Sequence, residues 1–304
     1  MKPPVFEYLA PRSLDEALEL TARAGDGTVP LAGGQSLLPL LNHRRVRPVS
    51  VVDLNGLPGL DTVEYDGSSV RIGALTRLRA LERDTALAAA LPVLRETVRL
   101  VAHPQIRSRS TLGGSLCHAD PAAELPALAL ALDARLRLRS VDGERTVEAR
   151  DFYRPGGATA RWPGELLVSG ELPLHDGFRF CFTEVTRSGQ GGFPLVGICA
   201  GVRCDATGRV AEARLAGAGV ADRPLRLTAT EQALTGRRFT PPRDDVDEVV
   251  AAARDEADPP PGPHGSSAYR TALLGTVVRR ALARLAGEGD DGEGRKGNGG
   301  GGTA

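Results

Sequence analysis

The 304-residue sequence predicts an α+β protein with two domains, residues 1–175 and 176–286, and a disordered tail, 287–304. Strand-like and helix-like segments are mixed up to about residue 175, without the regular alternation of a parallel βαβ fold. The pattern changes at ELPLHDGFRFCFTEV, residues 171–185, where long strand-like stretches begin and helical stretches follow. The tail is rich in glycine and charge and has no core-forming residues.

The first elements are predicted from local signals. Ser13 and Glu16 form a capping-box pattern at the start of SLDEALELTARAG, which has the apolar spacing of a helix. The segment TVPLAG, residues 28–33, predicts a short strand. The β-branched segment VSVVDLN, residues 49–55, predicts a buried strand.

The middle of the first domain is predicted in the same way. Residues 68–81 predict a strand followed by a helix that starts near Thr76. One helix is predicted over 87–102, ending before His103-Pro104, because the residue before a proline avoids the helical region. A further helix is predicted over 124–134, and then a hairpin over 135–149 with Asp142-Gly143 at its turn.

The second domain is predicted to be a small antiparallel sheet with helices packed on one side. Strands are expected over 178–188 and 194–220, the latter with a turn at Gly208. Helical spacing follows in the segments 229–236, 245–257 and 267–287.

The composition excludes several functional classes. Lys+Arg and Asp+Glu both total 38, so the chain lacks the basic excess that a sequence-independent nucleic-acid partner requires. None of the four cysteines forms a C-x2-C pair, which argues against a zinc or iron–sulfur site. No run reaches about 18 apolar residues, so no membrane span is predicted. The N-terminus lacks a signal-peptide core, and we expect a cytoplasmic protein with reduced, mostly buried thiols.

Two Gly-Gly pairs stand beside small hydroxyl residues, in PLAGGQSLLPLL at 30–41 and in STLGGSLCHADPAAELPAL at 110–128. Glycine permits a positive φ and removes the Cβ atom, so that a ligand can approach consecutive backbone amides. Both pairs lead into apolar segments that can begin helices, whose N-termini favour anions. Neither fits G-x-G-x-x-G or the P-loop pattern. They are therefore either ordinary turns or two halves of one cradle, each holding one phosphate of a pyrophosphate.

Other candidate sites have simpler structural interpretations. His118, Asp120 and Glu124 have a spacing that suggests a metal site, but Asp120 precedes a proline and is more typical of an Asx turn. No metal site is therefore predicted. His43 and His103 are interpreted as structural residues. No G-x-S-x-G elbow or catalytic triad is present, so hydrolase chemistry is not supported.

Several segments together resemble one family. They are LAGGQSLLPLL, RPVSVVDL, HPQIRSRSTLGGSLCHADPAAELPALALALDA and YRTALLGTVVRRAL. In this order and spacing they resemble the FAD-binding middle subunit of molybdenum hydroxylases, the group that includes carbon monoxide dehydrogenase and xanthine dehydrogenase. The resemblance runs from about residue 3 to 286. It implies a two-part FAD-binding domain of the vanillyl-alcohol-oxidase (PCMH) type, with subdomains at about 1–55 and 56–175, followed by the sheet-plus-helix domain.

The resemblance also implies where the cofactor lies. The residues it places against the FAD pyrophosphate are Ala32, Gly33, Gly34, Gln35, Ser36, Thr111, Leu112, Gly113, Gly114 and Ser115. It places Glu124 near the FAD ribose, and Ala102 and Leu167 in the lining of the flavin cavity. Phe193 and Leu195 fall beside the flavin ring, although Phe193 is equally well interpreted as a packing residue. Leu195 stands near the position of a lysine in xanthine dehydrogenase-like members, which leaves the final electron acceptor open.

The function that the resemblance implies is electron transfer, with no catalytic acid or base in this chain. A molybdopterin-containing large subunit oxidises the substrate, a [2Fe–2S] small subunit relays electrons, and FAD passes them to NAD, a quinone, oxygen or a carrier. The family implies a heterohexamer, a dimer of three-chain units. The hydroxybenzoyl-CoA reductase branch, with an extra [4Fe–4S] cluster, is disfavoured by the scattered cysteines. The alternatives are a stand-alone FAD oxidase, in which His118 would attach the flavin, and a non-catalytic FAD-binding assembly module. The substrate is not indicated.

Overall fold

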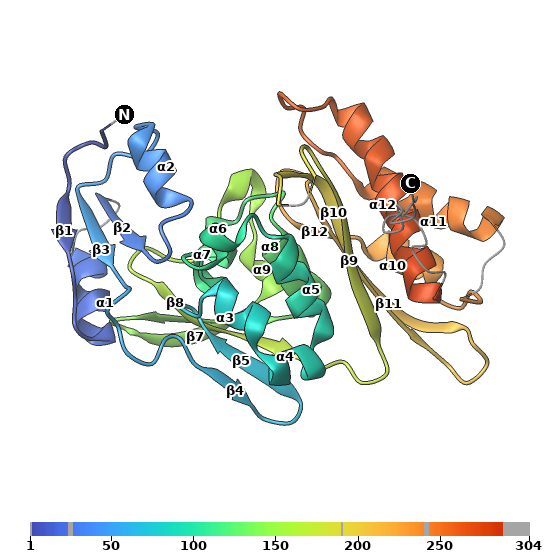
Figure 1. Ribbon diagram of the computed structural model, residues 1–304, viewed down its shortest axis with the longest axis horizontal. Helices are drawn as coiled ribbons and strands as arrows, with labels where there is room; N and C mark the ends of the chain where they lie inside the picture. The colour runs from blue at the N-terminus through green and yellow to red at the C-terminus, as the bar shows by residue number, and fades with distance from the viewer. Residues whose placement is uncertain (1, 24–26, 190, 240–242, 288–304) are drawn as a thin grey trace, which may run out of the picture.

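The computed structural model describes residues 2–23, 27–189, 191–239 and 243–287. In this part of the chain three β-sheets follow one another along the long axis of the molecule, each with helices against it (Figure 1). The predicted disordered tail lies outside the described residues, except for Gly287. This glycine has a φ of +85° and ends the last helix in the left-handed conformation.

The first sheet is parallel and has the order β1-β3-β2. Its strands are β1 (Glu7–Leu9), β2 (Thr28–Leu31) and β3 (Ser50–Asp53). Helix α1 (Leu14–Arg23) begins at the predicted capping box, where the Glu16 amide donates to Ser13 Oγ at 3.1 Å and the Arg12 amide donates to the Glu16 carboxylate at 2.7 Å. Helix α2 (Leu37–Asn42) follows the first glycine pair.

The second sheet is antiparallel and has the order β4-β5-β8-β6-β7. Its strands are β4 (Val63–Tyr65), β5 (Ser69–Gly73), β6 (Arg135–Ser140), β7 (Gly143–Glu148) and β8 (Leu166–Pro173). The associated helices are α3 (Leu78–Arg83), α4 (Thr85–Ala90), α5 (Pro92–Leu100), α6 (Pro104–Arg107), α7 (Leu112–His118), α8 (Glu124–Ala131), α9 (Ala149–Phe152) and the short 3-10 helix η2 (Pro155–Gly157). The largest apolar core lies between these helices and the sheet.

Two sequence predictions in this region need correction. The single helix expected over 87–102 is two helices, because Leu91 leaves the helical region and Pro92 begins α5 at a position where no amide hydrogen is required. The helix expected to start near Thr76 starts at Leu78. The hairpin of β6 and β7 is confirmed, with Ser140 opposite Gly143 at its turn.

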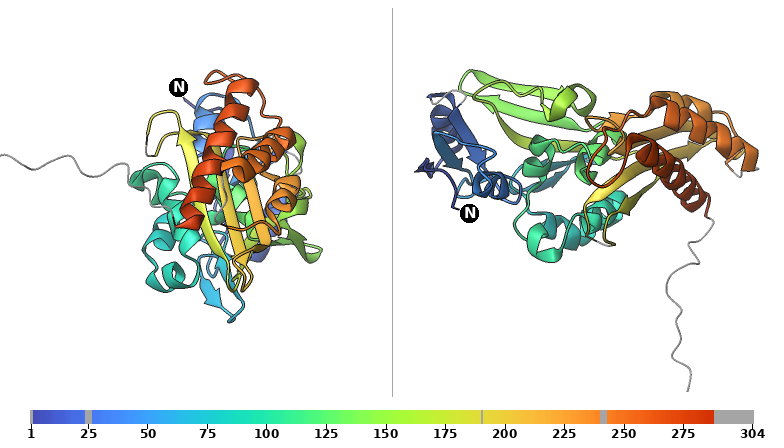
Figure 2. Two further views of the ribbon diagram at one scale, coloured as in Figure 1. Left: turned by 90° about the vertical axis from the view of Figure 1, so that its right-hand side faces the viewer. Right: turned by 90° about the horizontal axis from the view of Figure 1, so that it is seen from above.

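The third sheet is antiparallel and has the order β12-β11-β10-β9. Its strands are β9 (Arg179–Thr186), β10 (Pro194–Cys204), β11 (Val210–Ala218) and β12 (Leu225–Arg226). Helices α10 (Thr228–Leu234), α11 (Arg243–Glu256) and α12 (Ser267–Ala286) cover one face, as predicted (Figures 1 and 2). The other face packs against the helices of the second sheet, so Phe182 and Cys199 belong to the large central core.

Ion pairs hold the third sheet to the rest of the molecule. Arg284 of α12 pairs with Glu96 of α5, and the same carboxylate accepts the Phe182 amide at 3.0 Å. Arg226 binds Asp133 at 2.7 Å, and Arg214 also pairs with that carboxylate. One face of β9 and β10 therefore packs against α5 and α8. None of the helices in the described part of the chain combines the length and apolar character needed to cross a membrane.

Candidate functional site

The two glycine segments, far apart in sequence, meet in the fold. Gly33 packs directly against the backbone just before the second pair. A Cβ atom placed on Gly33 would lie 2.3 Å from the Arg109 carbonyl oxygen and 2.8 Å from Ser110 Cα. A Cβ atom on Gly114 would lie 3.8 Å from Ala32 Cβ. Only a residue without a side chain permits the approach at Gly33.

The first segment offers unused hydrogen-bond donors. Within the described part of the chain, the backbone amides of Gly33, Gly34, Gln35 and Ser36 donate to no protein acceptor. Gly34 has a φ of +74°, which turns the chain at this point, and Ser36 begins α2 without a side-chain cap. Consecutive unsatisfied amides at the start of a helix form a site for an anion.

The second segment is different, because its glycines lie inside the first turn of α7 rather than in an open loop. Thr111 caps this helix, its Oγ1 accepting the Gly114 amide at 3.0 Å, and its carbonyl accepts the Ser115 amide at 3.1 Å. The Gly113 amide donates to the Ala74 carbonyl at 2.8 Å, and a Cβ atom there would lie 2.6 Å from Ala74 Cβ. This segment therefore positions the first one. Its own amides, at Gly113, Gly114 and Ser115, already donate to acceptors within the protein.

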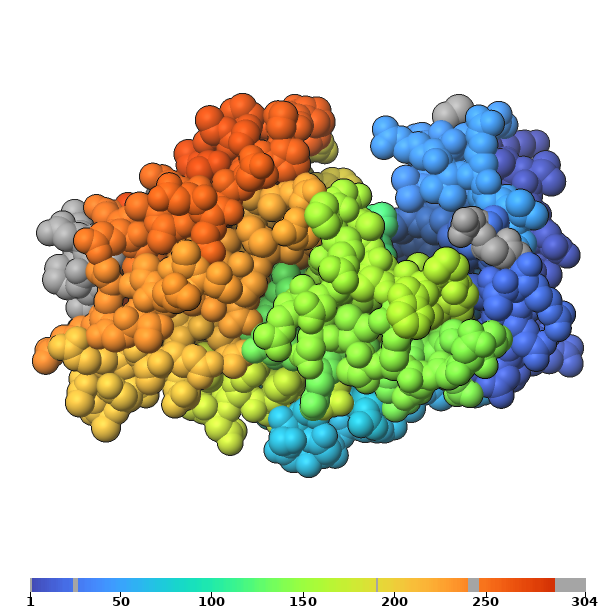
Figure 3. All heavy atoms as spheres, turned by 180° about the vertical axis from the view of Figure 1, so that it is seen from behind, coloured from blue at the N-terminus to red at the C-terminus, as the bar shows by residue number. Residues whose placement is uncertain are grey.

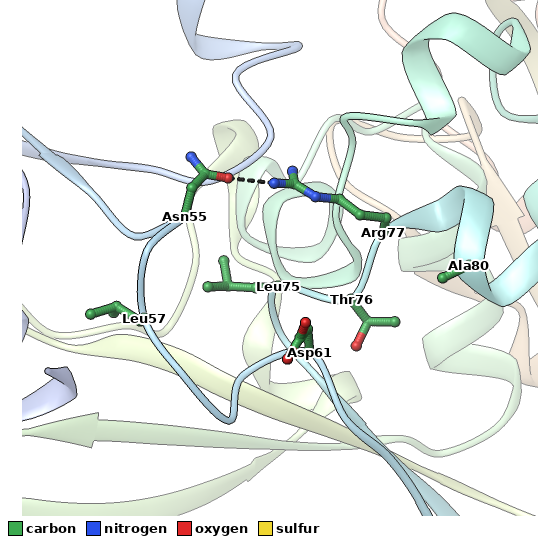
Figure 4. A pocket seen from close by; sticks show the side chains of 7 residues that line it. All are labelled: Asn55, Leu57, Asp61, Leu75, Thr76, Arg77 and Ala80. Atoms are coloured by element: carbon green, nitrogen blue, oxygen red, sulfur yellow. Dashed lines mark hydrogen bonds between the residues drawn. The ribbon is translucent and has the colours of Figure 1, made fainter. Parts of the chain in front are cut away.

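A polar network behind the first segment fixes its position. Asn55 accepts from Arg77 at 2.6 Å (Figure 4) and donates to the Ala32 carbonyl at 2.8 Å. Arg77 also donates to the Arg109 carbonyl. Burial disfavours a charge on Asp53, but hydrogen bonds from Tyr8 and Asn55 outweigh it and hold the pKa of Asp53 below its usual value. Sequence analysis missed these residues; the only signal was that Asp53 and Asn55 end a predicted strand.

A cavity of about 140 Å³ adjoins this network. Its lining consists of Asn55, Leu57, Asp61, Leu75, Thr76, Arg77 and Ala80 (Figure 4). Pockets for cofactors and drug-sized ligands enclose roughly 300–1,000 Å³. This cavity is too small for a dinucleotide. Figure 3 shows that the surface is also hollowed between the blue N-terminal part and the orange C-terminal part.

Ala102 lies in a strained turn after α5, with a φ of +43°. Arg107, which is 6% exposed, donates to the Ala102 carbonyl at 2.8 Å and to the Val101 carbonyl at 3.0 Å, and it pairs with buried Glu82 at 3.1 Å. A Cβ atom on Gly191, in the β9–β10 loop, would lie 2.9 Å from the Ala102 carbonyl. The turn thus joins the β9–β10 loop to the second sheet's helices.

Glu124 is the first residue of α8 and is 6% exposed. Burial raises its pKa to about 7, with a further contribution from the charge of Asp120. On β9, burial and the charge of Glu124 raise the pKa of Glu184 to about 8. The Gly219 amide, after β11, donates to the Pro121 carbonyl at 2.7 Å, so the turn before α8 also contacts the third sheet.

The remaining predicted residues lie in different environments. Leu195 is 7% exposed in β10, and its carbonyl accepts from Arg270 at 3.3 Å. Phe193 is 75% exposed, so it has no packing role within this chain. Leu167 of β8 is 7% exposed and belongs to the central core, which includes Leu112. Its side chain offers a ligand only apolar atoms.

The histidine and carboxylate triplet in the sequence does not form a metal centre. Asp120 Oδ1 accepts the Ala122 amide at 2.9 Å, which confirms the predicted Asx turn. His118 is exposed at the end of α7 opposite Thr111. Among the described residues, no group of three or more His, Cys, Asp and Glu side chains is placed to hold a metal ion.

Known proteins share both the sequence and the fold of this chain. Residues 4–175 match the family described as the FAD binding domain in molybdopterin dehydrogenase, and residues 180–285 match the CO dehydrogenase flavoprotein C-terminal domain. The 6-hydroxypseudooxynicotine dehydrogenase complex subunit alpha of Paenarthrobacter nicotinovorans is 39% identical over 93% of this chain and 95% of its own length. The carbon monoxide dehydrogenase medium chain of Afipia carboxidovorans is 35% identical over 93% of this chain and 98% of its own length.

A solved structure agrees with these matches. A chain of the carbon monoxide dehydrogenase from Hydrogenophaga pseudoflava superposes with a TM-score of 0.90 at 35% identity, covering 95% of this chain and 99% of that one. FAD is therefore the cofactor of this fold, and the α+β architecture with its C-terminal sheet-plus-helix domain is that of the family. The chain belongs to the FAD-binding flavoprotein subunits of the molybdenum hydroxylases, oxidoreductases of the carbon monoxide dehydrogenase and xanthine dehydrogenase type.

Proposed function

We propose that this chain is the electron-transferring subunit of a three-subunit molybdenum hydroxylase. Bound FAD supplies the redox chemistry that links a [2Fe–2S] donor subunit to an external acceptor. The chain itself binds and orients that cofactor and performs no substrate hydroxylation. The observation that carries the proposal is the meeting of the two glycine segments, with unused amides on the first.

In this proposal the two segments have unequal roles at the FAD pyrophosphate. The amides of Gly33, Gly34, Gln35 and Ser36 donate to the phosphate oxygens, with Ala32 at one edge of the cradle. The segment from Thr111 to Ser115 supplies the surface against which the first loop packs and the N-terminus of α7. The close approach at Gly33 supports this division, since a side chain there would separate the two segments.

The other predicted residues extend the site toward the third sheet. We assign Glu124 to a hydroxyl of the cofactor, and the turn at Ala102 and the side chain of Leu167 to the lining of the flavin cavity. Leu195 and Phe193 lie on the side of the flavin ring. In this arrangement residues 1–175 form the FAD-binding domain and residues 176–286 close it from the other side.

The proposed partners are a molybdopterin-containing large subunit and a [2Fe–2S] small subunit, in a cytoplasmic heterohexamer of two three-chain units. Relatives whose names describe a dehydrogenase complex subunit or a medium chain support the multi-subunit assignment. All four cysteines are unpaired, as expected in a reducing compartment. The exposed Phe193 leaves an aromatic surface beside the proposed ring site.

The cofactor assignment is tested on the purified chain. We expect a yellow protein whose flavin spectrum moves to the supernatant after acid precipitation and is identified there as FAD. Flavin that stays in the precipitate would instead support the oxidase alternative with covalent attachment. A colourless chain that fails to bind added FAD would overturn the proposal.

The electron-transfer role is tested by co-expression with the large and small subunits. We expect the three chains to copurify with the mass of two copies of each. Substrate should then reduce the bound flavin only when the [2Fe–2S] subunit is present. Oxidation of the substrate by this chain alone would contradict the proposed role.

A further inference from the structure

Four arginines converge on one buried acid near the end of α3. The Glu82 carboxylate lies 2.7 Å from Arg79 and 3.1 Å from Arg107. Arg99 lies 3.8 Å from the same carboxylate, and Arg95 donates to the Glu82 backbone carbonyl at 3.1 Å. A guanidinium group stays charged in a protein. One negative charge therefore faces four positive ones, and we call these four residues the arginine cluster.

The other acids of this region do not offset the excess. Residues 77–109 contain seven arginines and three acids, whereas the whole chain has equal numbers of basic and acidic residues. Asp84 is engaged as the N-cap of α4, and Glu96 pairs with Arg284 of α12. Positive charge is therefore concentrated on α3, α5 and α6, where α3 packs against the other two helices (Figure 1).

Two members of the arginine cluster reach the surface. The side chains of Arg79 and Arg99 are 32% and 53% exposed, whereas that of Arg107 is 7% exposed. A local excess of exposed charge of one sign attracts groups of the opposite sign from beyond contact distance. Arg79 and Arg99 can thus reach acidic groups of another molecule, while Arg107 and Glu82 hold the cluster in place.

The arginine cluster adjoins the proposed site of the flavin ring. Arg107 donates at 2.8 Å to the carbonyl of Ala102, which is proposed to line the flavin cavity. The β9–β10 loop packs on the same turn, since a Cβ atom on Gly191 would lie 2.9 Å from the Ala102 carbonyl oxygen and 2.8 Å from His103 Nδ1. Two residues further along this loop, Phe193 is 75% exposed. Exposed aromatic and arginine side chains together are typical of surfaces that bind another protein.

We propose that Arg79, Arg99 and Phe193 form the docking surface for the [2Fe–2S] subunit, which presents acidic side chains to the two arginines and an apolar pocket to the aromatic ring. This inference rests on the proposed function, because an electron donor has to bind close to the flavin. The positive charge speeds the encounter with an acidic donor, and the aromatic contact then slows its release. A surface that recognised an anionic membrane would not need to lie beside the cofactor site.

The test measures binding of the FAD-loaded full chain to the purified [2Fe–2S] subunit of the same enzyme, by biolayer interferometry at low and high salt. In Arg79→Gln/Arg99→Gln the association rate constant should fall about tenfold at low salt and match the wild type at high salt, because salt screens exposed charges. Phe193→Ala should instead raise the dissociation rate constant about tenfold at both salt concentrations.

The matched control removes two charges from other parts of the surface. In Arg23→Gln/Arg150→Gln the replaced side chains belong to α1 and α9 and are 73% and 66% exposed. This variant has the same net charge as the double variant of the arginine cluster. It should bind the [2Fe–2S] subunit as the wild type does, and both double variants should keep a full content of FAD.

The outcomes separate the inference from the proposed function. A folded, FAD-loaded Arg79→Gln/Arg99→Gln protein that associates as fast as the wild type at low salt would overturn the inference alone. If that variant does not fold, wild-type association that is equally fast at low and high salt overturns it. Wild-type binding to phosphatidylglycerol vesicles that is lost in a variant with normal [2Fe–2S] binding would assign the arginines to a membrane instead. A wild-type chain that binds no [2Fe–2S] subunit would refute the proposed function, and the inference with it.

Discussion

Replacement of Gly33 by alanine tests the central packing of the site. The added Cβ atom would lie 2.3 Å from the Arg109 carbonyl oxygen, and ordinary contacts begin at 3.4 Å, so the two backbones must separate by 3.4 − 2.3, or about 1 Å. The partner backbone is held from behind, because Arg77 donates to the Arg109 carbonyl and the Leu78 amide donates to the Ser110 carbonyl at 3.0 Å. The first loop therefore has to move.

The size of the effect follows from this displacement. Overpacking of this kind costs about 1–3 kcal/mol in the free energy of unfolding. Moving the loop by about 1 Å also takes two or more amides of Gly33–Ser36 out of hydrogen-bonding range of the pyrophosphate. At roughly 1.5 kcal/mol for each such bond to a charged group, we expect FAD affinity to fall about 100-fold.

The assay is a titration of apoprotein with FAD, followed by flavin fluorescence, with thermal unfolding measured in parallel. Gly56→Ala is the matched control, because the nearest atom to its added Cβ would be the Pro11 carbonyl oxygen at 3.9 Å. Gly34→Ala should lie between the two, since its φ of +74° costs about 1 kcal/mol while its Cβ meets only side-chain atoms, of Leu38 at 3.1 Å and of Leu31 at 3.4 Å. A Gly33→Ala protein of normal stability that binds FAD within threefold of the wild type would refute the reasoning.

Three further predictions concern the support of the site. Arg107→Met should destabilise the chain by about 2 kcal/mol in chemical denaturation, because the carbonyls of the Ala102 turn lose their donor and buried Glu82 keeps Arg79 as its near cation, at 2.7 Å, whereas the half-exposed Arg71→Met should cost under about 1 kcal/mol. Asn55→Ala should weaken FAD binding about fivefold to tenfold through loss of its bond to the Ala32 carbonyl, and unchanged binding would show that the loop is held without it. The pKa of Glu124 rises from 4.5 to about 7 on folding, so its contribution to apoprotein stability is complete below pH 4.5 and is lost as the pH rises through 7. Unfolding at pH 5 and pH 8 should therefore differ by about 3 kcal/mol more in the wild type than in Glu124→Gln; equal differences would contradict the assignment.

The elements that the sequence predicted correctly are those fixed by local chemistry. The capping box at Ser13 and Glu16 begins α1, and Gly208, with a φ of +77°, turns the chain between β10 and β11. The apolar spacing over 87–102 continues through Pro92, so spacing alone predicts one helix where the proline begins a second. The strands β1, β4 and β12 were not predicted, because two or three residues carry too little pattern and pairing with another strand decides them.

The site was predicted only in part, because local sequence shows its motifs but tertiary contacts decide their roles. The glycine motifs were recognisable, but the sequence alone treated them as equivalent loops. Their difference arises from tertiary contacts, since the Gly113 amide is occupied by the Ala74 carbonyl whereas Gly33 is pressed against Arg109.

The contacts of the third sheet with the FAD-binding domain bear on the proposed cofactor site. Besides the contacts with α5, they include both ends of α8: the Gly219 amide donates to the Pro121 carbonyl before the helix, and Arg226 binds the Leu130 carbonyl and Asp133 at its end. Because Glu124 is the first residue of α8, these contacts of the third sheet also fix the position of the acid proposed to bind a cofactor hydroxyl. Loosening the Arg226–Asp133 pair by Arg226→Met should therefore lower the affinity for FAD through the position of α8. An unchanged dissociation constant in a folded variant would show that the cofactor site does not depend on this junction.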